Sequence, residues 1–284
     1  MKNWVAPFIL PLAAASLIST SSMATPFATY RALYDLQPAR LSQGINAQPI
    51  DGKVAYEIQG SDCAGYTINS DYSTRYSNGE DGIRAVNTIS TSFESSDGLK
   101  LEVSQTQSVN KQVTDDSKIT AQRPRAGAEA QGNQQGMKKQ QFTIGGDVLF
   151  PTAHQRKLLA AAEAGQTRDV SLVYDGTDGA KQFRVVTFIG KKREAGTYAP
   201  DLANPEAQGL KGLSSWPFQL GYYATDSNSD TPDFQANFNM YENGVSTEML
   251  FDYGSFSMKG RLSHYEALPA ADCAAEGKSA TQPQ

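Results

Sequence analysis

The stretch FPTAHQRKLLAAAEAG, at residues 150–165, decides the fold. Pro151 and Thr152 mark a helix start, and the Thr152 hydroxyl can cap free backbone amides there. The interior consists of Leu, Ala, Gln, Arg, Lys and Glu, which are all strong helix formers. Gly165 stands where a left-handed residue commonly ends a helix. We therefore predict one α-helix over about residues 152–164.

The sequence on both sides of this helix alternates between apolar and polar residues and turns at glycine. Tyr30, Ala32, Tyr34 and Leu36 follow the period of two that is typical of a half-buried strand. Asn243-Gly244 is the clearest of several hairpin signals. We count roughly ten to fourteen strands with short turns and no alternation of strands with helices, which favours antiparallel pairing. The prediction is a mainly β protein in which one large sheet curls around one helix.

The composition fits one large domain. The chain has 284 residues, of which 39% are hydrophobic and 19% are charged. All-β folds of about 200–250 residues often remain undivided. The net charge of -5 does not indicate the basic surface that binding of nucleic acid or anionic lipid requires.

Residues 1–24 are predicted to be a signal peptide. Lys2 supplies the positive charge, an apolar run extends from Val5 to Ile18, and Ser22-Met23-Ala24 is a small-x-small cleavage site. We expect an exported, soluble protein that starts at Thr25, because no later stretch is long and apolar enough to span a bilayer.

Two segments of the predicted domain, residues 25–284, are expected to lie outside the packed sheet. Residues 110–140 hold no aromatic residue and are rich in Gln, Gly, Lys, Asp and Ala, so we expect a mobile insert there. Such an insert is either a solvated hairpin tip or a docking arm. The small, polar residues after 273 predict a flexible C-terminal tail.

The two cysteines, Cys63 and Cys273, most simply pair in an oxidising compartment. Closing a loop of roughly 200 residues would stabilise the fold by up to about 5 kcal/mol on the chain-entropy model. The alternative is a reactive thiol or a metal ligand.

Aromatic residues are the main candidates for a binding site. Either they fill the core, or they line a concave cleft that receives a peptide, a partner helix or an acyl chain. The three tyrosines Tyr66, Tyr72 and Tyr76 form a separate group, which also either fills the core or lines such a cleft. His154, in the first helical turn, is either a packing residue or part of the cleft. The candidate cleft residues are His154, Trp216, Phe218, Tyr222 and Tyr223.

No motif of an enzyme, a metal site or a cofactor site stands out. With the cysteines paired, two histidines leave too few ligands for zinc. The loop from Asp226 to Asp230 begins like a calcium loop but has Thr231 where glycine is needed. Ser108 and Lys111 have the Ser-x-x-Lys spacing, without the accompanying motifs of penicillin-binding enzymes. We expect no catalysis, no metal and no cofactor.

Taken together and in this order, several motifs resemble the cell envelope integrity protein EipB family of alphaproteobacteria. Membership implies a periplasmic β-spiral or open barrel packed on a helix, similar to the lipoprotein carriers LolA and LolB. It also implies a disulfide, carried over here to Cys63 and Cys273, and a non-enzymatic role in envelope integrity. A periplasmic partner with tetratricopeptide repeats is implied as well. The motifs are the signal peptide, GSDCAGYT at 60–67, FPTAH at 150–154, the helix end at Gly165, YDG at 174–176, WP at 216–217 and the late Cys273.

Two functions therefore compete. The first is a periplasmic protein that binds a protein or peptide partner and maintains the envelope. The second is a carrier of lipid or another hydrophobic ligand in a LolA/LolB-like concave sheet.

Overall fold

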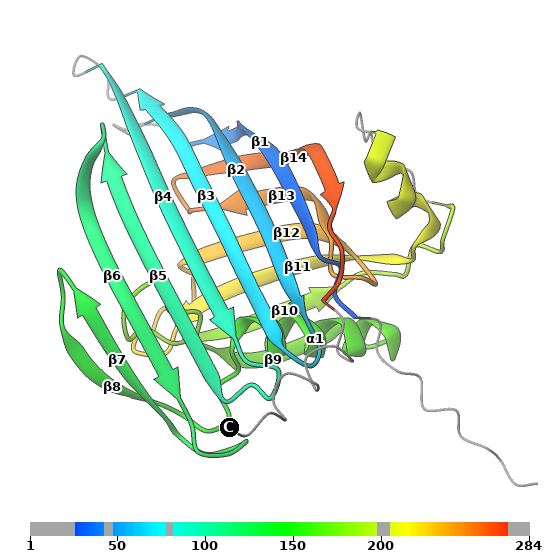
Figure 1. The fold of residues 1–284 in the computed structure, drawn as a ribbon. Coiled ribbons are helices and arrows are strands. Elements are labelled where there is room, and N and C mark those ends of the chain that lie inside the picture. Colours follow the sequence, from blue (N-terminus) through cyan, green and yellow to red (C-terminus); the bar gives the residue numbers. More distant parts are fainter. Residues whose placement is uncertain (1–25, 43–47, 78–81, 198–204, 272–284) are drawn as a thin grey trace, which may run out of the picture.

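The computed structural model describes residues 26–42, 48–77, 82–197 and 205–271. The predicted signal peptide, the tail after 273 and Cys273 lie outside the described residues. The described chain forms one fourteen-stranded antiparallel sheet with one α-helix, which confirms the predicted fold class (Figure 1).

The sheet consists of two meanders, which meet where the first strand pairs with the last. Each strand from β1 to β7 pairs with the next one along the chain, and so does each strand from β9 to β13. β1 then pairs with β14, from Tyr30 opposite Ala267 to Leu41 opposite Phe256. The strands are β1 (Tyr30–Leu41), β2 (Gln48–Ser61), β3 (Gly65–Ser77), β4 (Ile83–Glu94), β5 (Lys100–Val109), β6 (Gln112–Gln122), β7 (Ala130–Gly136), β8 (Gln140–Ile144), β9 (Arg168–Val173), β10 (Phe183–Ile189), β11 (Ser215–Ala224), β12 (Phe234–Tyr241), β13 (Ser246–Asp252) and β14 (Phe256–Ala267).

The two edge strands, β8 and β9, approach each other but do not close the sheet into a barrel. Just after β8, the Leu149 amide donates to the Leu172 carbonyl of β9 at 2.8 Å. The Tyr174 amide donates to the Leu149 carbonyl at 2.9 Å. These bonds make one isolated parallel bridge in the described residues. The sheet is therefore a spiral whose edges meet at one point.

The helix α1 (Pro151–Glu163) ends as the sequence predicts, but its start is capped differently. Gly165 has φ +72° and donates to the Ala162 carbonyl at 3.0 Å. At the other end the N-cap residue is Phe150, which makes no side-chain cap. The carboxylate of Glu94 instead accepts the amides of Thr152 and Ala153, at 2.6 and 3.1 Å. The helix start is thus capped by a strand side chain 58 residues away and not, as we expected, by the Thr152 hydroxyl.

Glu94 is a buried acidic residue with a structural role at the start of α1. It is only 5% exposed, and burial raises its pKa, while the bonds from Thr152 and Ala153 lower it. A negative charge at this position also complements the positive end of the helix dipole. Glu94 therefore fixes the start of α1 against the end of β4.

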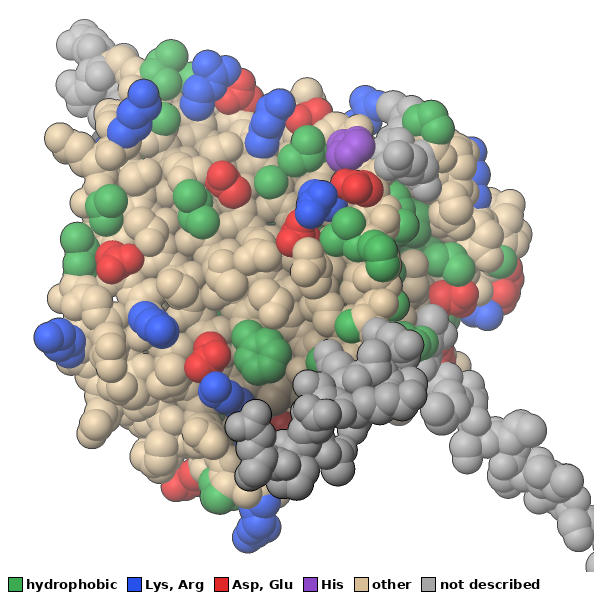
Figure 2. All heavy atoms as spheres, in the orientation of Figure 1, with side chains coloured by type: hydrophobic (Ala, Val, Ile, Leu, Met, Phe, Trp, Pro, Cys, Tyr) green, Lys and Arg blue, Asp and Glu red, His purple; other side chains and the backbone are tan. Residues whose placement is uncertain are grey.

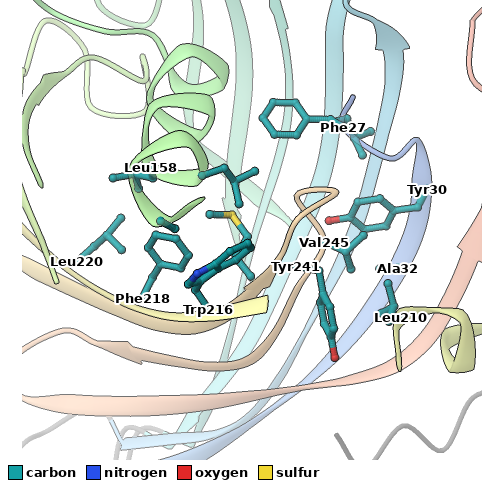
Figure 3. Packing of buried hydrophobic residues seen from close by; sticks show 14 of the residues in the cluster. Phe27, Tyr30, Ala32, Leu158, Leu210, Trp216, Phe218, Leu220, Tyr241 and Val245 are labelled. Carbon is teal, nitrogen blue, oxygen red and sulfur yellow. The ribbon is translucent and has the colours of Figure 1, made fainter. Parts of the chain in front are cut away.

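The main core lies between α1 and the inner face of the sheet. Leu158 of α1 belongs to one buried cluster with Phe218 and Leu220 of β11 (Figure 3). Arg156 extends from the helix over the ring of Phe27, with 4.6 Å from its guanidinium carbon to the ring centroid. The helix is thereby packed on both meanders.

The prediction that residues 110–140 lie outside the packed sheet is wrong for most of their length. They form β6 and β7, which extend the sheet beyond β5. Ile119, Ala121 and Ala130 face inward and are at most 1% exposed. Only one face of a strand needs apolar residues, so polar side chains on the other face gave the segment a loop-like composition.

A second, smaller core supports this part of the spiral. Ile119, Ala121 and Ala130 pack there with Phe150 and Tyr174. Arg123 is 7% exposed and donates to the carbonyls of Gly146 and Val148, at 3.2 and 2.9 Å. Its guanidinium lies 4.6 Å from the centroid of the Phe150 ring. Arg123 therefore connects β6 to the segment that leads into α1.

The 3-10 helix η2 (Pro205–Gly212) lies before β11. Its residues Ala207 and Leu210 are buried in the main cluster. Figure 1 places η2 at the side of the spiral, beside β14.

Replacing Glu94 tests whether it holds the helix start. Glu94→Ala leaves two amides of the first turn without acceptors, so we expect the free energy of unfolding to fall by about 2 kcal/mol. Glu94→Gln retains one acceptor oxygen and should lose about half of that. Urea titration followed by circular dichroism measures both variants.

Glu102→Ala is the matched control, because Glu102 lies on the neighbouring strand with its side chain 41% exposed, paired to Lys100. It should change stability by less than about 0.5 kcal/mol. Equal losses in Glu94→Ala and Glu102→Ala would contradict the capping role.

Candidate functional site

A cavity of about 380 Å³ lies inside the spiral, between α1 and the inner faces of both meanders. The period of two along each strand turns alternate side chains into it: Tyr30 and Tyr34 from β1, and Val54 and Tyr56 from β2. Its lining residues are Tyr30, Tyr34, Val54, Tyr56, Pro151, His154, Gln155, Leu158, Val173, Asp175, Leu220, Tyr222, Phe238, Met240, Gly244, Ser246, Met249 and Phe251.

The lining is apolar with a few uncharged polar groups. Asp175 is its one carboxylate, and it includes neither Lys nor Arg. The Asp175 carboxylate accepts the amide and the hydroxyl of Thr177, at 2.9 and 2.8 Å. Cavities of this size and character commonly hold small apolar ligands or single side chains of a partner.

The tyrosines supply hydroxyl groups that remain protonated. The Tyr34 hydroxyl donates to the Ser246 carbonyl at 3.0 Å, and burial raises the pKa of Tyr34. Burial likewise raises the pKa of Tyr30 and of Tyr56, whose ring centroids lie 5.5 Å apart. At neutral pH these groups are uncharged hydrogen-bonding partners for anything in the cavity.

His154 lies in the first turn of α1 and is 5% exposed. Its Nε2 is buried and has no hydrogen-bond partner in the described part of the chain. Burial lowers the pKa of His154 to about 4, while nearby Asp169 raises it and Lys157 lowers it. The ring is therefore neutral near pH 7.

Lys157 and Asp169 hold the helix beside His154 against β9. Their Nζ and Oδ1 atoms are 2.8 Å apart. The Ser171 hydroxyl donates to the other Asp169 oxygen at 2.6 Å. The charges nearest to the imidazole therefore neutralise each other.

An aromatic belt continues from the cavity along the inner face of the sheet. Tyr222 and Phe251 line the cavity, and both contact Phe234, at centroid distances of 5.6 and 6.1 Å. Tyr253 lies 5.1 Å from Phe234, is 37% exposed, and leads on to Phe256. The belt consists of Phe183, Tyr222, Phe234, Phe251, Tyr253, Phe256 and Tyr76.

The opposite, outer face of the sheet has a different character. Figure 2 shows small, separate groups of apolar side chains on the face over β3, β4 and β5, with positive and negative side chains interspersed among them and in part side by side. The inner cavity gathers apolar and aromatic side chains from α1 and from both meanders, which makes it the candidate site.

The structure brings some of the predicted cleft residues together and separates others. His154 and Tyr222 line the cavity. Phe218 stacks on the lining residue Phe238, at 5.8 Å between ring centroids. Trp216 is 3% exposed within the core. Tyr223 lies on the outer face, where Arg184 packs 4.4 Å from its ring centroid, so it is not part of the cavity.

The structure also separates the members of the group Tyr66, Tyr72 and Tyr76. Tyr66 is buried 5.5 Å from Phe27, in the core. Tyr76 is part of the aromatic belt, and the Tyr72 hydroxyl lies 3.4 Å from that of Tyr253. The cavity residues Tyr30, Tyr34 and Tyr56 were missed as site residues, although the period-two spacing of Tyr30 and Tyr34 already marked one inner face.

Cys63 lies in the turn between β2 and β3, with its sulfur 3.0 Å from the Ser61 hydroxyl. Cys273 is outside the described residues, so the pairing of Cys63 with Cys273 remains a prediction. In the described part of the chain, no group of three His, Cys, Asp or Glu side chains could hold a metal. No helix there is long and apolar enough to cross a membrane.

Known proteins and one protein family are similar to this chain. The EipB-like family matches residues 21–269. The cell envelope integrity protein EipB of Brucella abortus (strain 2308) is 28% identical over 249 residues, which are 86% of this chain and 85% of that protein. The crystal structure of a β-barrel-like protein of domain of unknown function DUF1849 from Brucella abortus matches with a TM-score of 0.78 at 27% identity, covering 87% of this chain and all of that one.

The low pKa of His154 predicts a pH dependence of stability. The unfolded chain binds a proton near pH 6.5, whereas the folded chain binds it only near pH 4, so stability falls as the pH falls between these values. The loss should be roughly 3 kcal/mol at most. Urea titrations at pH 7, 6, 5 and 4 measure it.

The variant His154→Gln should lack this part of the pH dependence, because glutamine does not titrate. His264→Gln removes the other histidine, which is exposed on β14, and serves as the control. A pH profile of His154→Gln that parallels the unsubstituted protein would contradict the assignment.

Proposed function

The chain belongs to the EipB-like family, as its motifs predicted, and on this premise we propose that it is a periplasmic, non-enzymatic protein that maintains the cell envelope by binding a protein or peptide partner. The Brucella relative is named for cell envelope integrity. The predicted signal peptide at residues 1–24 supports export to the periplasm. The family resemblance implies that this partner is a protein with tetratricopeptide repeats.

The inner cavity is the observation that carries this proposal. Its apolar walls, with Leu220 and Phe238 on one side and Leu158 on the other, suit an apolar side chain of a partner. The partly exposed aromatic belt beside it offers large, rigid contact surfaces of the kind that dominate binding energies.

The polar groups in the cavity support binding rather than catalysis. Nucleophilic catalysis needs a base hydrogen-bonded to a nucleophile. The buried Nε2 of His154 has no such partner among the described residues. The Tyr34 hydroxyl donates to a backbone carbonyl and is not bonded to a base.

Binding of a lipid or another hydrophobic ligand is the second candidate function. It is favoured by the apolar side chains that line the cavity from Leu158 of α1 to Phe251 of β13. An acyl chain binds to apolar walls without needing hydrogen bonds, because it has no backbone polar groups. This use would be similar to the concave sheets of LolA and LolB.

A variant that fills the cavity tests the first proposal. Val54→Phe adds a ring to the cavity wall, whereas Ile89→Phe makes a comparable change on the outer face, where Ile89 is 52% exposed. We expect crosslinking and pull-down of the exported protein to recover a defined partner with the parent and with Ile89→Phe. Recovery with Val54→Phe should fall about fivefold or more, the loss of about 1 kcal/mol that one blocked contact gives.

Undiminished crosslinking by a folded Val54→Phe variant would show that the partner does not use the cavity. Native mass spectrometry of the same preparations tests the second candidate. An apolar small molecule bound to the parent and absent from Val54→Phe would favour the lipid carrier, and parent protein that is consistently empty would disfavour it.

A further inference from the structure

The strands β9 and β10 present apolar side chains on the outer face of the sheet. Burial alternates along both strands, so that Val170 of β9 and Phe188 of β10 point outward and are 42% and 54% exposed. Val170 lies opposite Val186 in the ladder, and Phe188 is the next outward residue after Val186, so the three side chains adjoin. Single exposed apolar residues are ordinary, but adjoining ones are typical of interaction sites.

Two arginines border these apolar side chains. Arg168 lies opposite Phe188 in the same ladder, and Arg184 is the outward residue before Val186. The Arg184 guanidinium lies over the Tyr223 ring, 4.4 Å from its centroid, which leaves the N–H groups at its rim available to an acceptor. We refer to these residues together as the β9–β10 surface: Arg168, Val170, Arg184, Val186, Phe188 and Tyr223.

The arginines of the β9–β10 surface have no ion-pair partner among the described residues. Asp169 follows Arg168 but points inward and pairs with Lys157 at 2.8 Å. Asp233, whose amide donates to the Tyr222 carbonyl, pairs with Lys181 at 2.9 Å. The whole chain has a net charge of -5, so these cations do not belong to a generally basic surface. A partner with negative groups would complement them.

The strand β9 also has a free backbone edge. It forms a ladder with β10 only. The Leu172 carbonyl points away from β10, since it accepts the Leu149 amide, and the alternation along a strand turns the amides of Val170 and Arg168 in the same direction. Neither of these two amides has a backbone partner in the described part of the chain. An extended peptide can add to such an edge as a further strand.

A lipid membrane fits this surface less well than a peptide does. Val170 and Phe188 lie within strands, with the arginines on the same face, whereas insertion below lipid head groups needs apolar groups that project beyond their charged neighbours. Lipid head groups also lack the regularly spaced backbone groups that pair with an edge strand.

We propose that the β9–β10 surface binds an extended acidic segment of a partner protein, which pairs with the edge of β9. On the outward face of this segment, an apolar side chain lies beside Val170 and a carboxylate lies beside Arg168, because outward residues recur at every second position. The surface is separate from the inner cavity, so this proposal goes beyond the proposed function and does not rest on it.

Three matched fluorescent peptides test the proposal with the exported full-length protein. The outward positions of the first peptide carry aspartate, leucine and aspartate in turn, with serine between them; the other two have asparagine or lysine in place of aspartate. Fluorescence anisotropy at pH 7 measures their binding. The aspartate peptide should bind at least about tenfold more tightly than the asparagine peptide, and it should weaken severalfold between about 20 and about 300 mM NaCl. Absent binding, or equal binding of these two peptides, would overturn the proposal.

Variants then locate the contact. Arg168→Glu should weaken the aspartate peptide at least about tenfold and should bind the lysine peptide more tightly than the parent does, an exchange that misfolding cannot produce. Phe188→Ser removes the apolar contact and should weaken the aspartate peptide severalfold, which keeps the test open if Arg168→Glu does not fold. Lys118→Glu makes the matched charge change on the exposed face of β6 and should have no effect. Parent-like binding by folded Arg168→Glu or Phe188→Ser would contradict the proposal.

Two other occupants are outcomes of the same experiment. Cosedimentation of the parent, but not of Arg168→Glu, with phosphatidylglycerol vesicles, in the absence of peptide binding, would assign the surface to a membrane and overturn the proposal. Self-association of the parent that Phe188→Ser abolishes, measured by analytical ultracentrifugation, would assign the surface to a second copy of the chain, with the same consequence.

The cavity variant separates this proposal from the proposed function. Val54→Phe fills the cavity and should bind the aspartate peptide as the parent does. Loss of peptide binding in folded Val54→Phe would place the peptide in the cavity, so this proposal would fail while partner binding by the cavity would stand. If the parent binds the peptide as expected and Val54→Phe leaves partner crosslinking undiminished, the cavity function fails and this proposal stands.

Discussion

The pairing of the first strand with the last is the constraint on which the rest of the structure depends. Each meander is built from hairpins between neighbouring strands, which form locally, but the β1–β14 ladder joins residues more than 200 positions apart. It places Tyr30 and Tyr34 of β1 beside Tyr265 and Leu262 of β14. Without that ladder the inner faces of the two meanders would not share one cavity. Such distant pairing carries a large loop-closure cost, which many buried contacts must offset.

The helix is the second long-range element, and it is held by charges and aromatic rings as well as by apolar packing. Glu94 binds its first turn, and Arg156 is paired with Asp62 in the turn between β2 and β3. Lys157 ties it to Asp169 of β9. These contacts come from strands in both meanders, so α1 sits across the end of the spiral and forms one wall of the cavity. The position of His154 follows from this anchoring.

The misread segments show where sequence patterns are weak. Residues 112–122 and 130–136 resemble a solvated loop because their inner face, apart from Ile119 and Gln134, packs with small residues. Gly132, for example, lies against the ring of Phe142, where any side chain would clash. Tyr222 and Tyr223 were grouped because they are adjacent, yet adjacent strand residues point to opposite faces. Only Tyr222 could therefore reach the cavity.

By itself, the sequence determined the local structure: alternation specified the strands, the 150–165 stretch specified the helix and Gly165 its end, and the ordered motifs specified the family. These signals depend on a few neighbouring residues, so they can be read along the chain. Only the tertiary structure decided that Glu94 caps α1, that β6 and β7 belong to the sheet, and that Tyr30, Tyr56 and His154 line one cavity. Each of these depends on contacts between distant positions, whose geometry is set by the register of the whole spiral rather than by any local pattern.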